Sequence, residues 1–210
     1  MIKVLIADDH DVVRAGTRAL LETAQDIKVV GEASDGSAAI LEYERTQPDV
    51  VVLDISMPVM DGLEACKQLV SLHPNAKILI LTVHPEQHYA MRILKLGARG
   101  YLTKKASAEQ LKEAVRKVAR NELFVPAEST GIVLNQLLNI NLPNDLLGAL
   151  SDRELQVFFL LVSGRTLKEI SATIHTSIKS VDNYRSRILK KFGLRRTVDL
   201  VAFAYKQNLV

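Results

Sequence analysis

The sequence predicts an α/β protein in which a doubly wound, five-stranded parallel sheet is followed by a small all-α domain. Through residue 120, five short apolar runs rich in β-branched residues alternate with amphipathic helical segments, which is the order of βα units. The runs are continuous rather than alternating, so we expect strands buried on both faces of a parallel sheet. Residues 151–206 show only helical periodicity. A length of 210 residues accommodates two domains of this kind.

Each expected element follows from its apolar pattern, in chain order. The expected strands are Ile2–Ala7, Ile27–Glu32, Val50–Leu53, Ile78–Leu81 and Gly100–Leu102. The expected helices between them span residues 11–24, 36–46, 61–72, 86–96 and 107–120. The pattern then loosens into one further expected helix over 126–138 and a flexible stretch over 139–147, where Asn and Pro interrupt the period. We therefore expect a first domain at 1–122, a partly helical linker at 123–147 and a second domain at 148–210.

Composition and charge limit the class of protein. Residues 1–130 carry a net charge of −2, whereas residues 151–210 hold 11 Lys and Arg against 5 Asp and Glu, a net charge of +6. A basic module after a slightly acidic one indicates a polyanion partner for the second domain. The lone Cys66 excludes an intramolecular disulfide, which fits a reducing cytoplasm. No apolar run approaches the roughly 18–20 residues of a membrane span, so we expect a cytoplasmic protein without a membrane partner.

Acidic side chains follow two expected strands of the sheet. Asp8 and Asp9 come after the first strand and Asp54 after the third. Because the carboxyl ends of parallel strands share one edge, these carboxylates should meet in one cleft, where a cation must offset their repulsion. Hard oxygen ligands suit Mg²⁺, which keeps open positions for phosphate oxygens. With the hydroxyl of Thr82 and the cation of Lys104 after the fourth and fifth strands, the cleft is a plausible site for phosphoryl transfer.

Four segments of the first domain carry a family resemblance. ADDHDVVRAG, VVLDISMPVMDG, ILTVH and GARGYLTKKAS resemble the receiver domain of two-component response regulators, which has a flavodoxin-like fold. The resemblance covers essentially all of residues 1–120. It implies that Asp54 accepts a phosphoryl group from a sensor histidine kinase. It also implies that Asp9 and Asp54, with the backbone carbonyl of Ser56, ligate Mg²⁺, while Asp8 assists through water.

The same resemblance assigns the remaining pocket residues. Thr82 and Tyr101 match the switch pair of the family, which couples the phosphate to the surface of the domain, and Lys104 matches its pocket lysine. Pro58 and Gly62, in MPVMDG, match the turn beside the phosphorylation site. The histidines near the pocket (His10, His84 and His88) show no Cys/His spacing of a zinc site, so we expect supporting or surface roles for them.

The basic second domain shows the pattern of a helix-turn-helix. Residues 166–174 and 178–192 read as two helices joined by a short turn, the second of which would enter the major groove. Ser151 and Glu154 form a capping box before an earlier helix. The segment LSDRELQVFFLLVSGRTLKEISATIHTSIKSVDNYRSRILKKFGL resembles the LuxR-type helix-turn-helix of NarL/FixJ-family regulators. The resemblance implies a double-stranded promoter DNA partner.

The helical period separates two faces of the second helix of this motif. The expected core face consists of Val181, Tyr184, Ile188 and Phe192. The expected DNA-binding residues are Lys179, Asp182, Asn183, Ser186, Arg187 and Lys190. Two positions depart from the family pattern. His175 stands before the turn where an apolar residue is usual, either buried or facing solvent, and Asp182 either contacts a base or orients Arg185 or Arg187.

A closing helix over Thr197–Lys206 is consistent with two roles. Its apolar side chains (Leu200, Val201, Ala204 and Tyr205) would serve either the core or a partner helix, and in the family the corresponding helix resembles a dimerisation surface. We therefore expect a homodimer on activation. Taken together, the two modules predict a transcription factor, not an enzyme, whose dimerisation and DNA binding depend on phosphorylation of Asp54.

Three other functions are weighed against this one. A haloacid-dehalogenase-like phosphatase needs an acidic proton donor two residues after its nucleophilic Asp, and Ser56 occupies that position. A flavodoxin-like cofactor carrier needs a phosphate-binding loop after the first strand, where Asp8 and Asp9 would repel the phosphate. An RNA-binding antiterminator would share the receiver domain, but the spacing of the helix-turn-helix argues against it.

Overall fold

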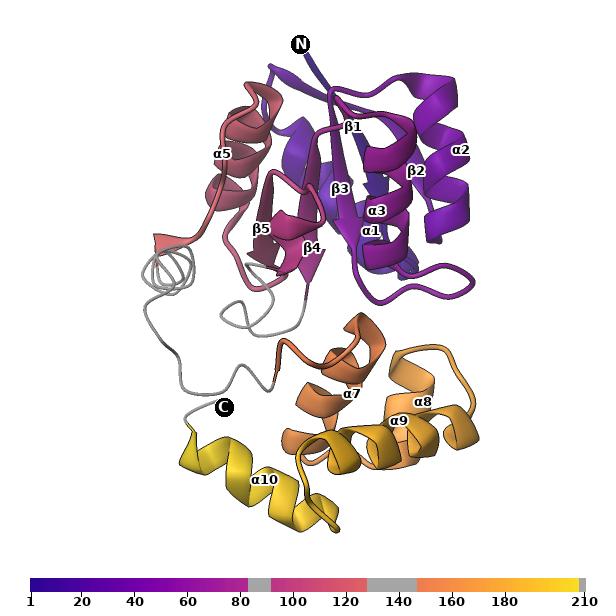
Figure 1. The fold of residues 1–210 in the computed structure, drawn as a ribbon. Coiled ribbons are helices and arrows are strands. Elements are labelled where there is room, and N and C mark those ends of the chain that lie inside the picture. The colour runs from indigo at the N-terminus through magenta and orange to yellow at the C-terminus, as the bar shows by residue number, and fades with distance from the viewer. Residues whose placement is uncertain (83–91, 128–146, 208–210) are drawn as a thin grey trace. The chain divides into compact units, whose positions relative to one another are not determined.

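The protein is described by a computed structural model, which covers residues 1–82, 92–127 and 147–207 (Figure 1). The chain divides into two compact units, Met1–Leu138 and Asn139–Val210, each of which is described by itself. Within the described residues, every helix is too short or too polar to cross a membrane.

The first unit contains a parallel sheet of five strands in the order β2-β1-β3-β4-β5. The strands are β1 (Ile2–Ala7), β2 (Ile27–Ala33), β3 (Val50–Asp54), β4 (Ile78–Thr82) and β5 (Gly100–Thr103). The chain starts in an interior strand, β1, moves to the neighbouring edge strand β2, and then crosses β1 to add β3, β4 and β5 toward the other edge. The predicted doubly wound topology is therefore confirmed, and strands β2 to β5 each extend one residue further than expected.

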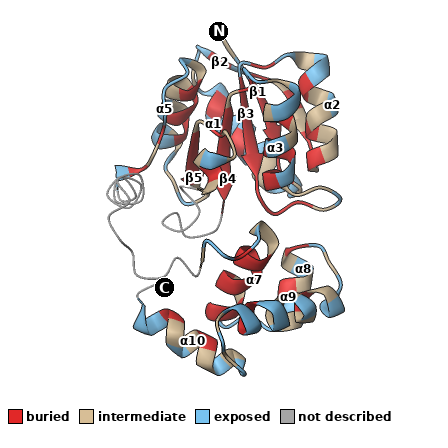
Figure 2. Ribbon diagram, in the orientation of Figure 1, coloured by how far each residue is buried: buried red, intermediate tan, exposed pale blue. Residues whose placement is uncertain are grey.

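Helices cover both faces of the sheet (Figure 1). They are α1 (Asp11–Glu22), α2 (Gly36–Thr46), α3 (Gly62–Leu72) and α5 (Ala108–Ala119). Helix α1 packs beside α5, and α2 packs beside α3. The central strands are buried on both sides, as Figure 2 shows in red, and all residues of β3 and β4 are buried. This burial explains why their apolar runs are continuous rather than alternating.

Short polar residues start three helices of the first unit. Asp35, Asp61 and Ser107 accept hydrogen bonds from backbone amides in the first turns of α2, α3 and α5. Gly62, the first residue of α3, lies so close to the end of β3 that a Cβ atom would overlap with the backbone carbonyl of Asp54. Only glycine therefore permits this close approach between helix α3 and the end of strand β3.

The described part of the second unit, residues 147–207, contains four helices. They are α7 (Asp152–Val162), α8 (Leu167–Thr173), α9 (Ile178–Lys191) and α10 (Thr197–Lys206). The predicted capping box of Ser151 and Glu154 is present. Aromatic rings join three of the helices, because Phe192 stacks on Phe158 at a centroid distance of 5.5 Å and meets Phe203 edge-on at 5.3 Å.

The core face of α9 differs in part from the prediction. Val181 and Ile188 are fully buried as expected, but Tyr184 is only half-buried, and Leu189, which was not expected in the core, is buried. The physical reason is that α9 packs against both α7 and α8, so its apolar surface is wider than one stripe of the helical period. In α10, Leu200 and Ala204 are buried whereas Tyr205 is exposed.

Some sequence predictions lie outside the described residues. These include most of the expected helix 126–138, the stretch 139–146, His84, His88 and the first half of the expected helix 86–96, of which residues 92–95 are helical. The domain boundaries stay a prediction. Phe124 nevertheless packs within the first unit, where it forms an isolated bridge with Gly100 and is buried in the core.

Candidate functional site

The first unit gathers two buried carboxylates around one lysine at the carboxyl edge of the sheet. Lys104, one residue after β5, places its Nζ 2.6 Å from Asp8 Oδ2 and 2.9 Å from Asp54 Oδ2. The side chains of Asp8 and Asp54 are each only 3% exposed. Three strands therefore deliver these residues to one point, as the parallel topology predicts.

Asp54 is held in an environment that disfavours its charge. Burial raises the pKa of Asp54 to about 6, the Lys104 ammonium opposes this increase, and the neighbouring Asp8 carboxylate adds to it. The backbone N–H of Ile55 donates a 2.8 Å hydrogen bond to Asp54 Oδ1. One lysine thus serves two carboxylates, which leaves the pocket short of positive charge.

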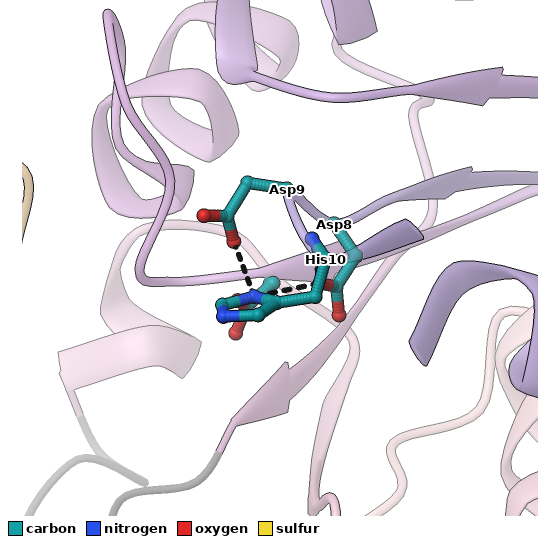
Figure 3. A group of neighbouring side chains, drawn as sticks. Asp8, Asp9 and His10 are labelled. Atoms are coloured by element: carbon teal, nitrogen blue, oxygen red, sulfur yellow. Dashed lines mark hydrogen bonds and ion pairs between the residues drawn. The ribbon is translucent and has the colours of Figure 1, made fainter. Parts of the chain in front are cut away.

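Asp9 lies beside the same pocket, where the His10 imidazole contacts the carboxylates of both Asp8 and Asp9. The imidazole Nδ1 of His10 lies 2.8 Å from Asp9 Oδ1 and 3.5 Å from Asp8 Oδ1, as the dashed lines in Figure 3 show. Ligand atoms of Asp8, Asp9, His10 and Asp54 all lie within 4.8 Å of one another. The set offers three carboxylates and one imidazole, and oxygen ligands of this kind suit a hard divalent cation.

The other predicted pocket residues lie on or shortly after strands β3, β4 and β5 of the same sheet. Ser56 is buried two residues after Asp54. Thr82 ends β4 and is fully buried, and its backbone carbonyl accepts a 2.7 Å hydrogen bond from the N–H of Lys104. Tyr101 is also fully buried in β5, where it is paired with Ile80. The pocket and the predicted switch residues are therefore joined through the backbone of β4 and β5.

The second unit presents a separate candidate surface on α9. A four-residue segment, residues 174–177, separates α8 from α9, and Ser177 caps α9 by accepting a hydrogen bond from the N–H of Ser180. The expected DNA-binding residues that are exposed are Lys179, Asn183, Ser186, Arg187 and Lys190. Val181 and Ile188 face the core from the same helix. The helix therefore has one basic exposed side and one apolar buried side.

The two departures from the family pattern have defined positions. His175 is exposed and adopts a left-handed backbone conformation, with φ of 50°, at the end of α8. Asp182 forms an ion pair with Arg185, in which Arg185 Nη2 lies 2.7 Å from Asp182 Oδ1. His175 thus faces solvent, and Asp182 contacts a neighbouring arginine on the same helix.

Two family matches agree with these two sites. Residues 4–116 match the response regulator receiver domain, and residues 148–204 match the luxR family of bacterial regulatory proteins. The chain belongs to the LuxR-type response regulators. This response regulator therefore joins a receiver domain to a DNA-binding domain, and its family consists of transcription regulators rather than enzymes. Receiver domains in general bind Mg²⁺ at their acidic pocket, and response regulators interact with histidine kinases and DNA.

Individual relatives match the response regulator over its whole length. It is 37% identical to the oxygen regulatory protein NreC of Staphylococcus carnosus, a match that covers 100% of this chain and 99% of NreC. It is 35% identical to the response regulator UvrY of Escherichia coli, covering 100% and 96% of the two chains. The structure of RcsB from Salmonella enterica serovar Typhimurium, bound to promoter rprA in the presence of phosphomimetic BeF₃⁻, is similar with a TM-score of 0.63. That match has 26% identity and covers 96% of this response regulator and 97% of RcsB.

Two groups of contacts in the response regulator were missed by sequence reasoning. Arg14 donates a hydrogen bond to the backbone carbonyl of Asp8, beside the acidic pocket. In the second domain, Lys191 joins the end of α9 to Glu154 at 2.6 Å. Arg14 lies within the quoted motif ADDHDVVRAG, but an arginine on an amphipathic helix gives no signal of where its guanidinium points.

Proposed function

We propose that Asp54 is the phosphoryl acceptor of this response regulator and that its donor is a sensor histidine kinase. The observation that carries the proposal is the placement of a buried Asp54 carboxylate 2.9 Å from Lys104, at the edge of the sheet where Asp8 and Asp9 also lie. In the transfer, an Asp54 carboxylate oxygen forms a bond to phosphorus while the bond from phosphorus to the nitrogen of the kinase histidine breaks. Lys104 pairs with the charge on the phosphoryl oxygens.

The residues present fit a magnesium ion. Asp9 and Asp54, with the backbone carbonyl of Ser56, would hold it, and Asp8 would assist through water. Bound Mg²⁺ would neutralise charge on the carboxylates and on the phosphoryl oxygens. The fit is supported by the lack of charge balance in the pocket, where Lys104 is the one lysine that contacts both Asp8 and Asp54 among the described residues.

Phosphorylation would change the surface of the receiver domain through Thr82 and Tyr101. A phosphoryl oxygen on Asp54 would accept a hydrogen bond from the Thr82 hydroxyl and draw the end of β4 toward the pocket. The adjacent Tyr101 ring would then adopt a second packing arrangement, which is the kind of two-state element that amplifies a small local change. We propose that this change favours a homodimer, in which two DNA-binding domains act together in the cytoplasm.

Helix α9 would read promoter DNA in the major groove. Lys179 and Lys190 would contact phosphates, while Asn183 is suited to a base edge because its amide can both donate and accept. Ser186 would lie on the same face, and Arg187 would flank it. We assign Asp182 an orienting role, supported by its 2.7 Å ion pair with Arg185.

Labelling with acetyl phosphate and MgCl₂ tests the phosphoacceptor. The wild-type protein should gain one phosphate by intact mass spectrometry, and Asp54→Ala should gain none. Sedimentation of both proteins, with and without the donor, should show a dimer only for the phosphorylated wild type. If Asp54→Ala is labelled like the wild type, the acceptor is a different residue.

DNA binding to a cognate and a scrambled duplex tests the orientation of α9. Lys190→Ala should weaken binding to both duplexes alike, since a phosphate contact carries no sequence information. It should also lower the slope of log affinity against log salt concentration by about one unit. Asn183→Ala should reduce the binding free energy by about 1–3 kcal/mol for the cognate duplex only. Equal losses on both duplexes for Asn183→Ala would contradict the proposed orientation.

A further inference from the structure

Arg14 connects three parts of the receiver domain through one side chain. Its Nη1 donates a 2.7 Å hydrogen bond to the backbone carbonyl of Asp8, its Nε donates at 2.9 Å to Glu32, and its Nη2 donates at 2.6 Å to Asp11. The side chain is 15% exposed although it comes from helix α1. The planar guanidinium makes all three bonds from one fixed orientation, which the single ammonium of lysine cannot do.

The carbonyl that Arg14 contacts belongs to the peptide between Asp8 and Asp9. The other side of Asp8 is also fixed, because its N–H donates a 3.1 Å hydrogen bond to the carbonyl of Ala33 at the end of β2. The Asp8 carboxylate in turn accepts a 2.9 Å hydrogen bond from the N–H of His10. Because the peptide is planar, fixing the Asp8 carbonyl fixes the direction in which the backbone of Asp9 leaves the strand.

We propose that Arg14 is a positioning residue of the acidic pocket, which sets the Asp8–Asp9 peptide so that Asp9 is directed toward the cation site. The proposal rests on the Mg²⁺ site put forward above. Glu32, one residue before the end of β2, anchors the guanidinium to the sheet, and Asp11 anchors it to α1. Arg14 does not contact the cation itself, so it acts through the geometry of Asp9.

Arg18 provides a matched control on the same helix. It lies one turn further along α1 and also pairs with Glu32, at 3.0 Å. Its other carboxylate contact is Glu22, at 4.0 Å, away from the pocket. Arg14→Gln and Arg18→Gln therefore each remove one positive charge and one contact with Glu32, but only Arg14→Gln removes the hydrogen bond to the Asp8 carbonyl.

Calorimetric titration of the full chain with MgCl₂ is the first test. Arg14→Gln should raise the Mg²⁺ dissociation constant about tenfold, the lower end of the loss typical when a partner behind the ligands is removed. Arg14→Lys should also bind weakly, and Arg18→Gln should stay within about twofold of the wild type. Wild-type affinity in Arg14→Gln, or an equal loss in Arg18→Gln, would overturn the proposal. If Arg14→Gln fails to fold by circular dichroism, Arg14→Lys decides: wild-type affinity overturns the proposal.

Labelling with acetyl phosphate separates this inference from the proposed function. Arg14→Gln should need about tenfold more MgCl₂ for half-maximal labelling but should reach the wild-type rate at saturation. A rate that stays low at saturating MgCl₂ would contradict a role confined to positioning. Labelling of Asp54→Asn, by contrast, would refute the phosphoacceptor and leave the effect of Arg14 on Mg²⁺ binding standing.

Discussion

Each domain contains a buried carboxylate paired with a lysine, yet the two pairs have opposite properties. In the receiver domain, Lys104 lies 2.9 Å from Asp54, and in the DNA-binding domain Lys191 lies 2.6 Å from Glu154. The Asp54 and Glu154 side chains are almost equally buried, at 3% and 4% exposed. Burial raises the pKa of Asp54 to about 6. Burial acts in the same direction on Glu154, but hydrogen bonds from Lys191 and Ser151 outweigh it and lower that pKa.

The difference lies in how deeply each carboxylate lies within its domain, Asp54 being the deeper, and in what else surrounds it. Glu154 accepts a hydrogen bond from the backbone N–H of Ser151, and its lysine also donates to the carbonyl of Ala149. Asp54 shares its lysine with a second buried carboxylate, Asp8. One pair thus completes a helix cap, whereas the other leaves two carboxylates with one cation. A buried ion pair is a structural element in the first case and an incomplete charge set, suited to a further cation, in the second.

The largest expected effect is on the receiver domain. Because the pKa of Asp54 is raised from 3.8 to about 6, its ionised form destabilises the fold as pH rises through that interval, and the full penalty applies above it. In protein without divalent cations at pH 8, Asp54→Asn should therefore raise the free energy of unfolding by about 3 kcal/mol. The gain should vanish near pH 4.

Urea unfolding at the two pH values measures this change. Asp26→Asn is the control, since the hydrogen bonds from Arg116 lower the pKa of Asp26 to about 2 and removal of its charge must not stabilise the protein. A loss of stability in Asp54→Asn at pH 8 would show that the acidic pocket is already balanced.

Addition of Mg²⁺ should stabilise the domain that contains the Asp54 pair, but not the domain that contains the Glu154 pair, by a free energy of similar size. At about 100 times its dissociation constant, Mg²⁺ should stabilise the receiver domain by about 2.7 kcal/mol, because it binds only the folded pocket. The DNA-binding domain should be unaffected. Differential scanning calorimetry with MgCl₂ checks the expectation for each domain, and KCl of equal ionic strength is the control. The effect must disappear in Asp54→Asn.

Removal of the carboxylate charge in the second domain should lower the free energy of unfolding, which is the opposite of the effect expected for Asp54→Asn. Glu154→Gln removes the negative charge from the group that accepts hydrogen bonds from Lys191 and Ser151 and leaves the Lys191 ammonium without its carboxylate, so it should destabilise the DNA-binding domain by about 2 kcal/mol at pH 7. Since the pKa of Glu154 is lowered, its contribution is present above its unfolded value of 4.5 and is lost as pH falls through the folded value. Labelling of Asp54 should not change.

The exposed capping box of α8 provides the control for Glu154. Glu169 accepts hydrogen bonds from Thr166 in the same arrangement but, within the described residues, forms no ion pair with a lysine, so Glu169→Gln should destabilise the domain much less than Glu154→Gln. Equal losses from Glu154→Gln and Glu169→Gln in guanidinium unfolding would mean that Lys191 contributes nothing.

The smallest effect should come from the third pair, on the surface of α9. Asp182 and Arg185 are 47% and 35% exposed, so Asp182→Asn should change the free energy of unfolding by less than about 0.5 kcal/mol. If Asp182 orients Arg185, the same variant should bind cognate DNA more weakly. Fluorescence anisotropy on the duplexes described above checks this. A stability loss as large as that of Glu154→Gln would break the distinction between surface and buried pairs.

The sequence predicted the pocket better than the contacts that support it. Asp8, Asp54 and Lys104 follow three strands, and parallel topology alone brings the ends of those strands together. Arg14 and Lys191 were missed because their roles depend on which way a long, flexible side chain leaves its helix. Leu189 was missed, and Tyr184 was placed too deep, since the width of a buried helix face depends on how many neighbouring helices pack against it.

The most direct test of this account is the titration of the two carboxylates themselves. Carbon-13 NMR of the Asp54 and Glu154 carboxyl groups, followed from pH 3 to pH 8 with and without MgCl₂, measures both pKa values in the same protein. We expect Asp54 to titrate at about 6 without Mg²⁺ and well below that value with it, while Glu154 titrates below 4.5 in both conditions. An Asp54 pKa that is already below 4 without Mg²⁺, or that Mg²⁺ leaves unchanged, would contradict the account.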